Sequence, residues 1–207
     1  MSQGDAFRCF PDHPRLSNQS GSSSRRRLMT TDSLFMAGAL AVAVIGSATD
    51  IATRRIPNRL TYFAMLAALA GRFAVHGWRG LGSGIAGGLI AGGAFLVFFL
   101  IRAMGAGDVK LVTAVGCFVG PTTAVEVVLA STIAGGVFAL IFALWQGRLR
   151  IVLANVVKIL RFHATEGAEV HPSLNLSNPQ STRLPYGVAI AAGVLYSAMA
   201  FYCRGGI

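Results

Sequence analysis

Residues 105–111 read Gly-Ala-Gly-Asp-Val-Lys-Leu, and this stretch places the carboxylate of Asp108 at the start of an apolar run, 109–120. Hydrocarbon cannot hydrate a carboxylate, so an acid at the mouth of an apolar segment is energetically costly. The two glycines before Asp108 let another backbone come close. This pattern predicts a site at Asp108.

A second acid, Asp50, stands in a similar position at the end of another apolar run, 33–49. The chain contains only 8 Asp and Glu residues, and basic residues follow closely after both Asp50 and Asp108. Two isolated acids at the ends of separate hydrophobic segments predict one shared site at the membrane edge.

The composition indicates an integral membrane protein. Hydrophobic residues make up 54% of the chain, charged residues make up 13%, and the mean hydropathy is +0.60. Soluble domains carry about 25% charged residues. A chain of 207 residues suits one helical bundle with little left for a soluble domain, because each span needs about 20 residues.

The net charge of +10 does not indicate a nucleic-acid partner, because the basic residues are scattered between apolar runs. Cytoplasmic loops rich in Lys and Arg explain them better. The three cysteines form no CxxC pair and the four histidines form no HExxH pattern. We therefore predict no metal site and no cofactor.

The hydrophobic pattern predicts an all-α membrane protein, a bundle of about six transmembrane helices within a single domain, 33–203. The predicted spans are 33–49, 60–75, 81–101, 109–120, 124–145 and 184–203. The third has glycines at four-residue spacing, which is typical of close helix packing, at positions 80, 84, 88 and 92. An amphipathic segment, 151–162, predicts a further helix lying along the membrane surface.

The first 32 residues are polar, rich in Ser and Arg, and predict a disordered tail. Met29 is an alternative start, since it leads directly into the first span. The loops 50–59, 102–110 and 146–183 carry three, two and five Lys or Arg residues, which predicts that both aspartates face the cytoplasm. The five arginines before residue 28 would then lie outside, against this rule, so either the chain starts later or the topology is wrong, and we favour the later start.

Two aspartates that approach within a few ångströms cannot both ionise easily, so the pair holds one proton near neutral pH. One carboxylate can then activate a water while its protonated partner polarises a carbonyl and protonates the leaving amine. This chemistry hydrolyses a peptide without a metal or a covalent intermediate. Gly105 and Gly107 would admit the unwound substrate backbone.

Three motifs resemble those of the prepilin peptidases, membrane aspartyl proteases of the GxGD type. They are Asp50 with Arg54-Arg55-Ile56-Pro57-Asn58, the 105–111 stretch, and Leu184-Pro185-Tyr186-Gly187. The resemblance is closest to the short form found with Flp/Tad pilus systems, the TadV and CpaA group. It implies that Asp50 and Asp108 are catalytic and that the protein lies in the inner membrane of a bacterium with its site facing the cytoplasm.

The resemblance also implies the substrate, a pilin or pseudopilin precursor whose short basic leader is removed just before a hydrophobic helix. Long family members also methylate the new amino terminus through an inserted domain with paired CxxC motifs. This chain has neither feature, so we expect no methyltransferase activity. The sequence does not indicate an oligomeric state.

The supporting residues are open to more than one interpretation. Lys110 either lowers the pKa of the ionised aspartate, contacts substrate, or is an interfacial cation. Arg54, Arg55 and Arg59 fix the topology or contact the leader, and Pro57 with Asn58 shapes the turn. Pro185, Tyr186 and Gly187 help to close the site, without a chemical role that the sequence reveals.

Other functions remain open at this point. A proton-coupled carrier or channel would use the same acids as a proton relay, although the two halves of the chain show no inverted repeat. A non-catalytic assembly factor would share the fold. A preflagellin peptidase would differ in the precursor that it accepts.

Overall fold

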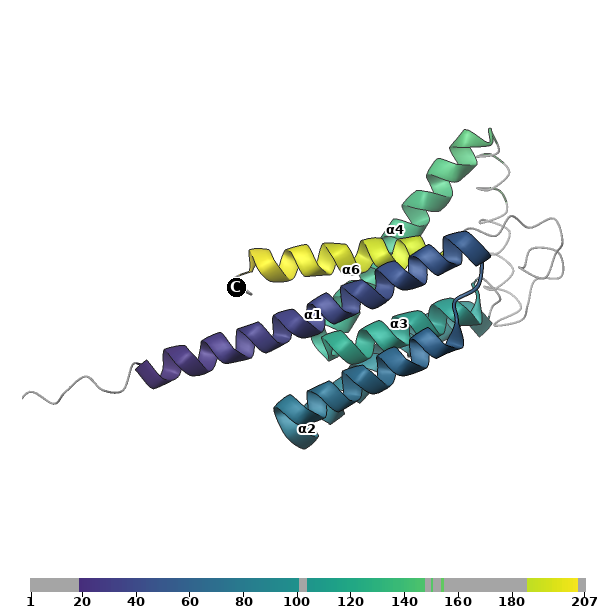
Figure 1. The fold of residues 1–207 in the computed structure, drawn as a ribbon. Coiled ribbons are helices and arrows are strands. Elements are labelled where there is room, and N and C mark those ends of the chain that lie inside the picture. Colours follow the sequence, from purple (N-terminus) through teal and green to yellow (C-terminus); the bar gives the residue numbers. More distant parts are fainter. Residues whose placement is uncertain (1–18, 101–103, 148–149, 151–153, 155–185, 205–207) are drawn as a thin grey trace, which may run out of the picture.

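The computed structural model describes residues 19–100, 104–147, 150, 154 and 186–204. Helices are the only regular elements in these parts, in agreement with the predicted all-α class (Figure 1). The five helices are α1 (Gln19–Thr53), α2 (Asn58–Leu100), α3 (Ala106–Val119), α4 (Pro121–Trp145) and α6 (Tyr186–Cys203).

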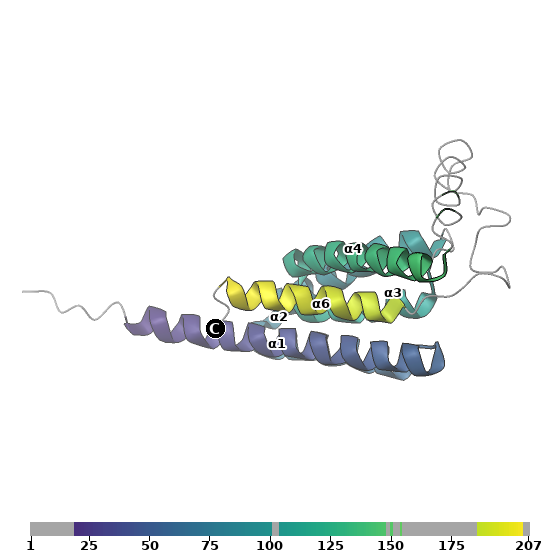
Figure 2. The same cartoon turned by 90° about the horizontal axis from the view of Figure 1, so that it is seen from above.

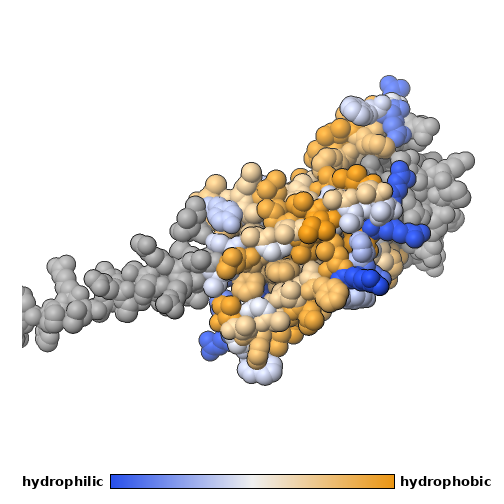
Figure 3. All heavy atoms as spheres, viewed as in Figure 1, coloured by the Kyte–Doolittle hydropathy of each residue, from blue (hydrophilic) through white to orange (hydrophobic). Residues whose placement is uncertain are grey.

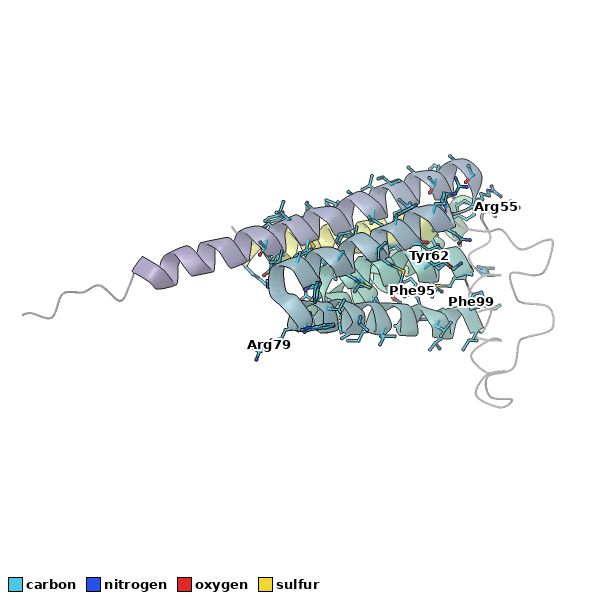
Figure 4. All side chains as sticks on the ribbon, turned by 60° about the horizontal axis from the view of Figure 1, so that its bottom comes forward. Arg55, Tyr62, Arg79, Phe95 and Phe99 are labelled. Atoms are coloured by element: carbon cyan, nitrogen blue, oxygen red, sulfur yellow. The ribbon has the colours of Figure 1, made fainter. Side chains whose placement is uncertain are left out.

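Helix α2 combines two of the predicted spans, 60–75 and 81–101. Its backbone leaves the helical conformation at Gly77, where φ is 60° and ψ is −147°. The two halves fold back on each other and pack closely. This is shown by Gly84 in the second half, where a Cβ would lie 2.9 Å from the side chain of Leu69 in the first half. Figure 4 shows the reversal beside Arg79. A positive φ is inexpensive for glycine, which explains why the hairpin turns there.

Helix α3 is the short central helix of the bundle, and α1, α2, α4 and α6 all contact it. Its side chains are buried on several faces, including Leu111, Val112 and Val115, each with no exposed surface. Figures 1 and 2 show the longer helices around it. A helix that is apolar all round belongs inside a bundle, and this position fixes Asp108 relative to its neighbours.

The glycine row of α2 packs against α3, as its spacing predicts. A Cβ at Gly88 would lie 2.6 Å from the Cys117 sulfur, and one at Gly92 would collide with Thr113. Gly87, directly before Gly88, faces the carbonyl of Gly116. Small residues therefore let two helices approach closely where lipid supplies no hydrophobic drive.

Four of the described helices, α1, α2, α4 and α6, are long and apolar enough to cross a membrane. Large hydrophobic side chains cover much of the visible surface, as Figure 3 shows. The chain is therefore a helical membrane protein. The count of six spans stays a prediction that depends on the two halves of α2 and on the 14-residue α3.

Two predictions concern segments at the start of α1 and after α4. Helix α1 begins at Gln19, inside the stretch predicted to be a disordered tail, and its apolar part begins at Thr31. The predicted surface helix 151–162 falls almost entirely outside the described residues, as do residues 1–18 and 155–185.

The end of α3 opposite Asp108 is held by a buried arginine. Arg72, 7% exposed, donates from Nε and Nη2 to the Phe118 carbonyl at 3.0 and 2.6 Å. Its Nη1 lies 3.4 Å from the Ser83 hydroxyl, and its guanidinium stacks over Phe35. Arg72 thus satisfies one of the carbonyls that a helix C-terminus leaves without an intrahelical partner.

Candidate active site

Asp50 lies in the last turn of α1 and is partly buried. The helix ends immediately after it, because Arg54 adopts a left-handed conformation with φ of 51° and donates its N–H to the Asp50 carbonyl at 2.8 Å. A left-handed residue one turn later is a common way for a helix to stop. This turn leaves Asp50 at the end of a long helix, beside the start of α3.

Asp108 lies in the first turn of α3, where it also caps the helix. Gly105 is the N-cap residue, and its N–H donates to Asp108 Oδ2 at 3.2 Å. A carboxylate in this position satisfies a free N–H group and interacts favourably with the helix dipole. The cap fixes the orientation of the Asp108 side chain.

The two aspartates interact electrostatically. Burial and, to a smaller extent, the nearby charge of Asp50 together raise the pKa of Asp108 from its ordinary value of 3.8 to about 6. The hydrogen bond from Gly105 opposes both effects because it favours the carboxylate. The structure therefore brings together two acids that lie far apart in the sequence and favours a proton on Asp108.

The first turn of α6 completes the surroundings of Asp50. The Gly187 N–H donates to Asp50 Oδ2 at 3.1 Å. A Cβ at Gly187 would lie 3.1 Å from both Cβ and Oδ2 of Asp50, so only glycine fits without displacing the aspartate. A helix N-terminus is a favourable place for a carboxylate because its N–H groups and dipole face the negative charge.

Tyr186 stands beside this contact. Its ring packs edge-on against Phe95, with ring centroids 6.3 Å apart, and its hydroxyl points at Gly135 of α4. The next residue, Gly187, donates to Asp50, so Tyr186 lies near the aspartate pair. The sequence predicts that Pro185, Tyr186 and Gly187 help to close the site but gives them no chemical role, because nothing local indicates that α6 meets α1 and α3 here.

Lys110 links α3 to the start of α2. Its Nζ donates to Asn58 Oδ1 at 3.0 Å and lies 5.5 Å from the centroid of the Tyr62 ring. The sequence offered three roles for Lys110. The described contacts add a fourth, which is to join the 105–111 stretch to the Asp50–Asn58 motif. Asn58 and Asp50 flank the same turn, so this hydrogen bond connects the loop after Asp50 to the helix that carries Asp108.

Gly107 supports the same junction. A Cβ there would lie 3.3 Å from the Ile56 Cβ, so the absence of a side chain lets the turn after α1 rest on α3. Gly105 is extended, with φ of −83°, and a Cβ on it would approach Asp108 Oδ2 at 3.3 Å. Both glycines thus have packing roles within the site.

The remaining predicted residues lie around this junction or outside the described chain. Arg54, Arg55 and Pro57 are exposed in the turn between α1 and α2, and Figure 4 shows Arg55 at that end of the bundle. Arg59 is also exposed, at the start of α2. Pro185 lies outside the described residues.

Comparison with known proteins identifies the family. The model of the type IV leader peptidase family matches residues 36–140, which is just over half of the 207 residues. This match includes Asp50, Asp108 and the turn between α1 and α2. No curated protein and no solved structure matches the chain. The extent of the family match, together with the helical membrane fold, shows that this chain belongs to the type IV leader peptidase family.

Proposed function

We propose that this protein is an aspartyl endopeptidase that removes the leader of pilin or pseudopilin precursors, with Asp50 and Asp108 as its catalytic pair. The observation that carries the proposal is their electrostatic coupling at one end of the bundle, where Asp50 contributes to a pKa of about 6 for Asp108. Membership of the leader peptidase family supports a precursor as substrate.

Asp108 holds the shared proton in the resting pair, and Asp50 is the base. The raised pKa of Asp108 supports the first assignment. The Gly187 N–H donates to Asp50 Oδ2 and therefore needs an oxygen that carries no proton, which supports Asp50 as the base. Water loses a proton to Asp50 as its oxygen attacks the scissile carbonyl, which accepts a hydrogen bond from Asp108. The proton of Asp108 then passes to the leaving nitrogen as the C–N bond breaks.

Other groups position this pair. Gly187 orients Asp50, Gly105 orients Asp108, and the Lys110–Asn58 hydrogen bond holds the two motifs in register. Preorganised donors of this kind reduce the reorganisation needed at the moment of reaction. Gly105, which is exposed, also admits the extended substrate backbone, whereas Gly107 is covered by Ile56.

The active site faces the cytoplasm and the protein lies in the inner membrane of a bacterium, with six transmembrane spans. The excess of Lys and Arg in the loops on the side of the two aspartates supports this orientation. The absence of paired CxxC motifs from these 207 residues supports the Flp/Tad-type form, and we expect cleavage without methylation of the new amino terminus.

Co-expression with a short Flp-type prepilin tests the proposal, with leader removal scored by intact mass. We expect Asp50→Asn and Asp108→Asn to abolish cleavage while both variants still insert into the membrane. Glu126→Gln is a matched control, because Glu126 is an acid that pairs with Arg204 outside the site. Full cleavage by either aspartate variant would refute the two-aspartate mechanism. The same mass measurement reports any methylation.

A further inference from the structure

An apolar cavity opens between α4 and α6 at the end of the bundle that carries the two aspartates. Its volume is about 330 Å³. The lining residues are apolar, aromatic or glycine, and they are Gly135, Phe138, Ile141, Phe142, Trp145, Tyr186, Val188 and Ala189. In Figure 1 the C-terminal half of α4 diverges from the start of α6, which is where these residues lie.

The cavity borders the proposed active site at Tyr186. The Tyr186 ring lines the cavity, and the charge of Asp108 acts on its hydroxyl. The next residue, Gly187, donates to Asp50. A chain segment in the cavity would therefore have its end beside the aspartate pair.

We propose that this cavity binds the apolar segment of the precursor that follows the scissile bond; the proposal rests on the proposed peptidase function. Among the described residues, the lining offers no charged partner, so burying the basic residues of a leader there would be costly. The apolar side of the cleavage site meets no such penalty. The leader therefore lies outside the cavity, on the other side of Tyr186.

The length of the cavity fits a helical segment. From Gly135 to Trp145 the axis of α4 rises about 15 Å, which corresponds to nearly three helical turns. Gly135 and Ala189 line the cavity from opposite helices, and the Tyr186 hydroxyl packs against Gly135. Phe138, Phe142 and Trp145 supply the broad apolar wall.

Two neighbouring residues of α4 provide a matched test. Ile141 lines the cavity and is 50% exposed, whereas Leu140 is 44% exposed and does not line it. Successive helix residues point about 100° apart at the same membrane depth. Tryptophan at position 141 should obstruct the cavity, and tryptophan at position 140 should project toward lipid.

The kinetic test measures kcat/KM for the full-length precursor with Ile141→Trp and Leu140→Trp. We expect Ile141→Trp to lower kcat/KM by about tenfold or more and Leu140→Trp to change it by less than about twofold. Equal effects of the two substitutions would overturn the proposal.

Photocrosslinking tests occupancy directly and separately from catalysis. A benzophenone amino acid is placed at position 141 or 140 of the Asp108→Asn protein in membranes that contain labelled precursor. We expect crosslinks to the precursor from position 141 alone. Crosslinks from position 141 only to lipid, or equal precursor crosslinks from both positions, would overturn the docking site. Cleavage by Asp108→Asn itself would instead refute the two-aspartate mechanism. The crosslinks would still report whether the precursor occupies the cavity.

Discussion

The N–H of Gly187 donates a hydrogen bond of 3.1 Å to Asp50 Oδ2, across 137 positions of the sequence. This contact joins the start of α6 to the end of α1 and directs a helix N-terminus at a carboxylate. It gives the last helix a direct part in orienting the proposed catalytic base.

Gly187→Ala should therefore impair catalysis. The added methyl group would lie 3.1 Å from Asp50 Cβ and Oδ2, so the carboxylate or α6 must shift. We expect kcat/KM for leader removal to fall by about tenfold or more, because small misplacements of a catalytic group are costly. Gly82→Ala is the control, since a Cβ at Gly82 meets nothing within 4 Å. Wild-type cleavage by Gly187→Ala would contradict the orienting role.

The raised pKa of Asp108 predicts how stability depends on pH. The folded protein binds this proton more tightly than the unfolded chain, since the pKa is about 6 rather than 3.8. The stabilisation is complete below pH 4 and is lost as the pH rises to about 6. We expect Asp108→Asn to remove this dependence and to be more stable at pH 8, by up to about 3 kcal/mol. Thermal unfolding in detergent across this pH range measures the effect, and an unchanged profile would contradict it.

The same pKa predicts the pH profile of cleavage. The proposed mechanism needs a proton on Asp108, and the free enzyme loses that proton near pH 6. The kcat/KM for precursor cleavage should therefore decline above about pH 6, since this ratio reports ionisations of the free enzyme. A profile that keeps rising through pH 8 would assign the proton to another group.

Lys110→Met should weaken catalysis by loosening the junction of the two motifs. It removes the hydrogen bond to Asn58 and the contact with the Tyr62 ring. We expect kcat/KM to fall about fivefold, which corresponds to about 1 kcal/mol for one charged hydrogen bond at the surface. Asn58→Ala should have a similar effect, and the double variant should be no worse than either single one. Fully additive losses would show that Lys110 acts independently of Asn58.

Replacement by alanine should have opposite effects on stability at Gly87 and Gly93 of α2. A methyl group at Gly87 would collide with the Gly116 carbonyl of α3, whereas a Cβ at Gly93 meets nothing within 4 Å. Gly87→Ala should lower the unfolding midpoint in detergent, since the two helices must separate. Gly93→Ala should leave it unchanged or raise it, because alanine favours a helix over glycine by about 1 kcal/mol. Equal midpoints would contradict the close packing.

Arg72→Lys should destabilise the bundle, although the charge is kept. A lysine lacks the planar guanidinium that donates twice to the Phe118 carbonyl. We expect the loss of about 1–3 kcal/mol of stability, measured by unfolding in detergent. Arg79→Lys, at the exposed hairpin turn of α2, is the control. A comparable loss in both variants would mean that the Phe118 contact contributes little.

The sequence by itself determined the class of the protein, the positions of its apolar segments and the two acids that stand out. These are local properties, because hydropathy over about 20 residues identifies a membrane helix. A lone carboxylate beside such a segment is conspicuous for its cost. The glycine spacing of 80–92 likewise predicted a packing face, and the structure confirms close packing there, with α3 against Gly88 and Gly92 and the first half of α2 against Gly80 and Gly84.

Only the tertiary structure decided which distant groups meet around those acids. The contacts of Gly187 with Asp50, Lys110 with Asn58 and Arg72 with Phe118 each join different helices. Such contacts depend on how helices pack in three dimensions, and the apolar pattern of one helix does not specify its neighbour when lipid is equally apolar. The helix bundle therefore turned two isolated aspartates into an interacting pair and placed an apolar cavity beside them.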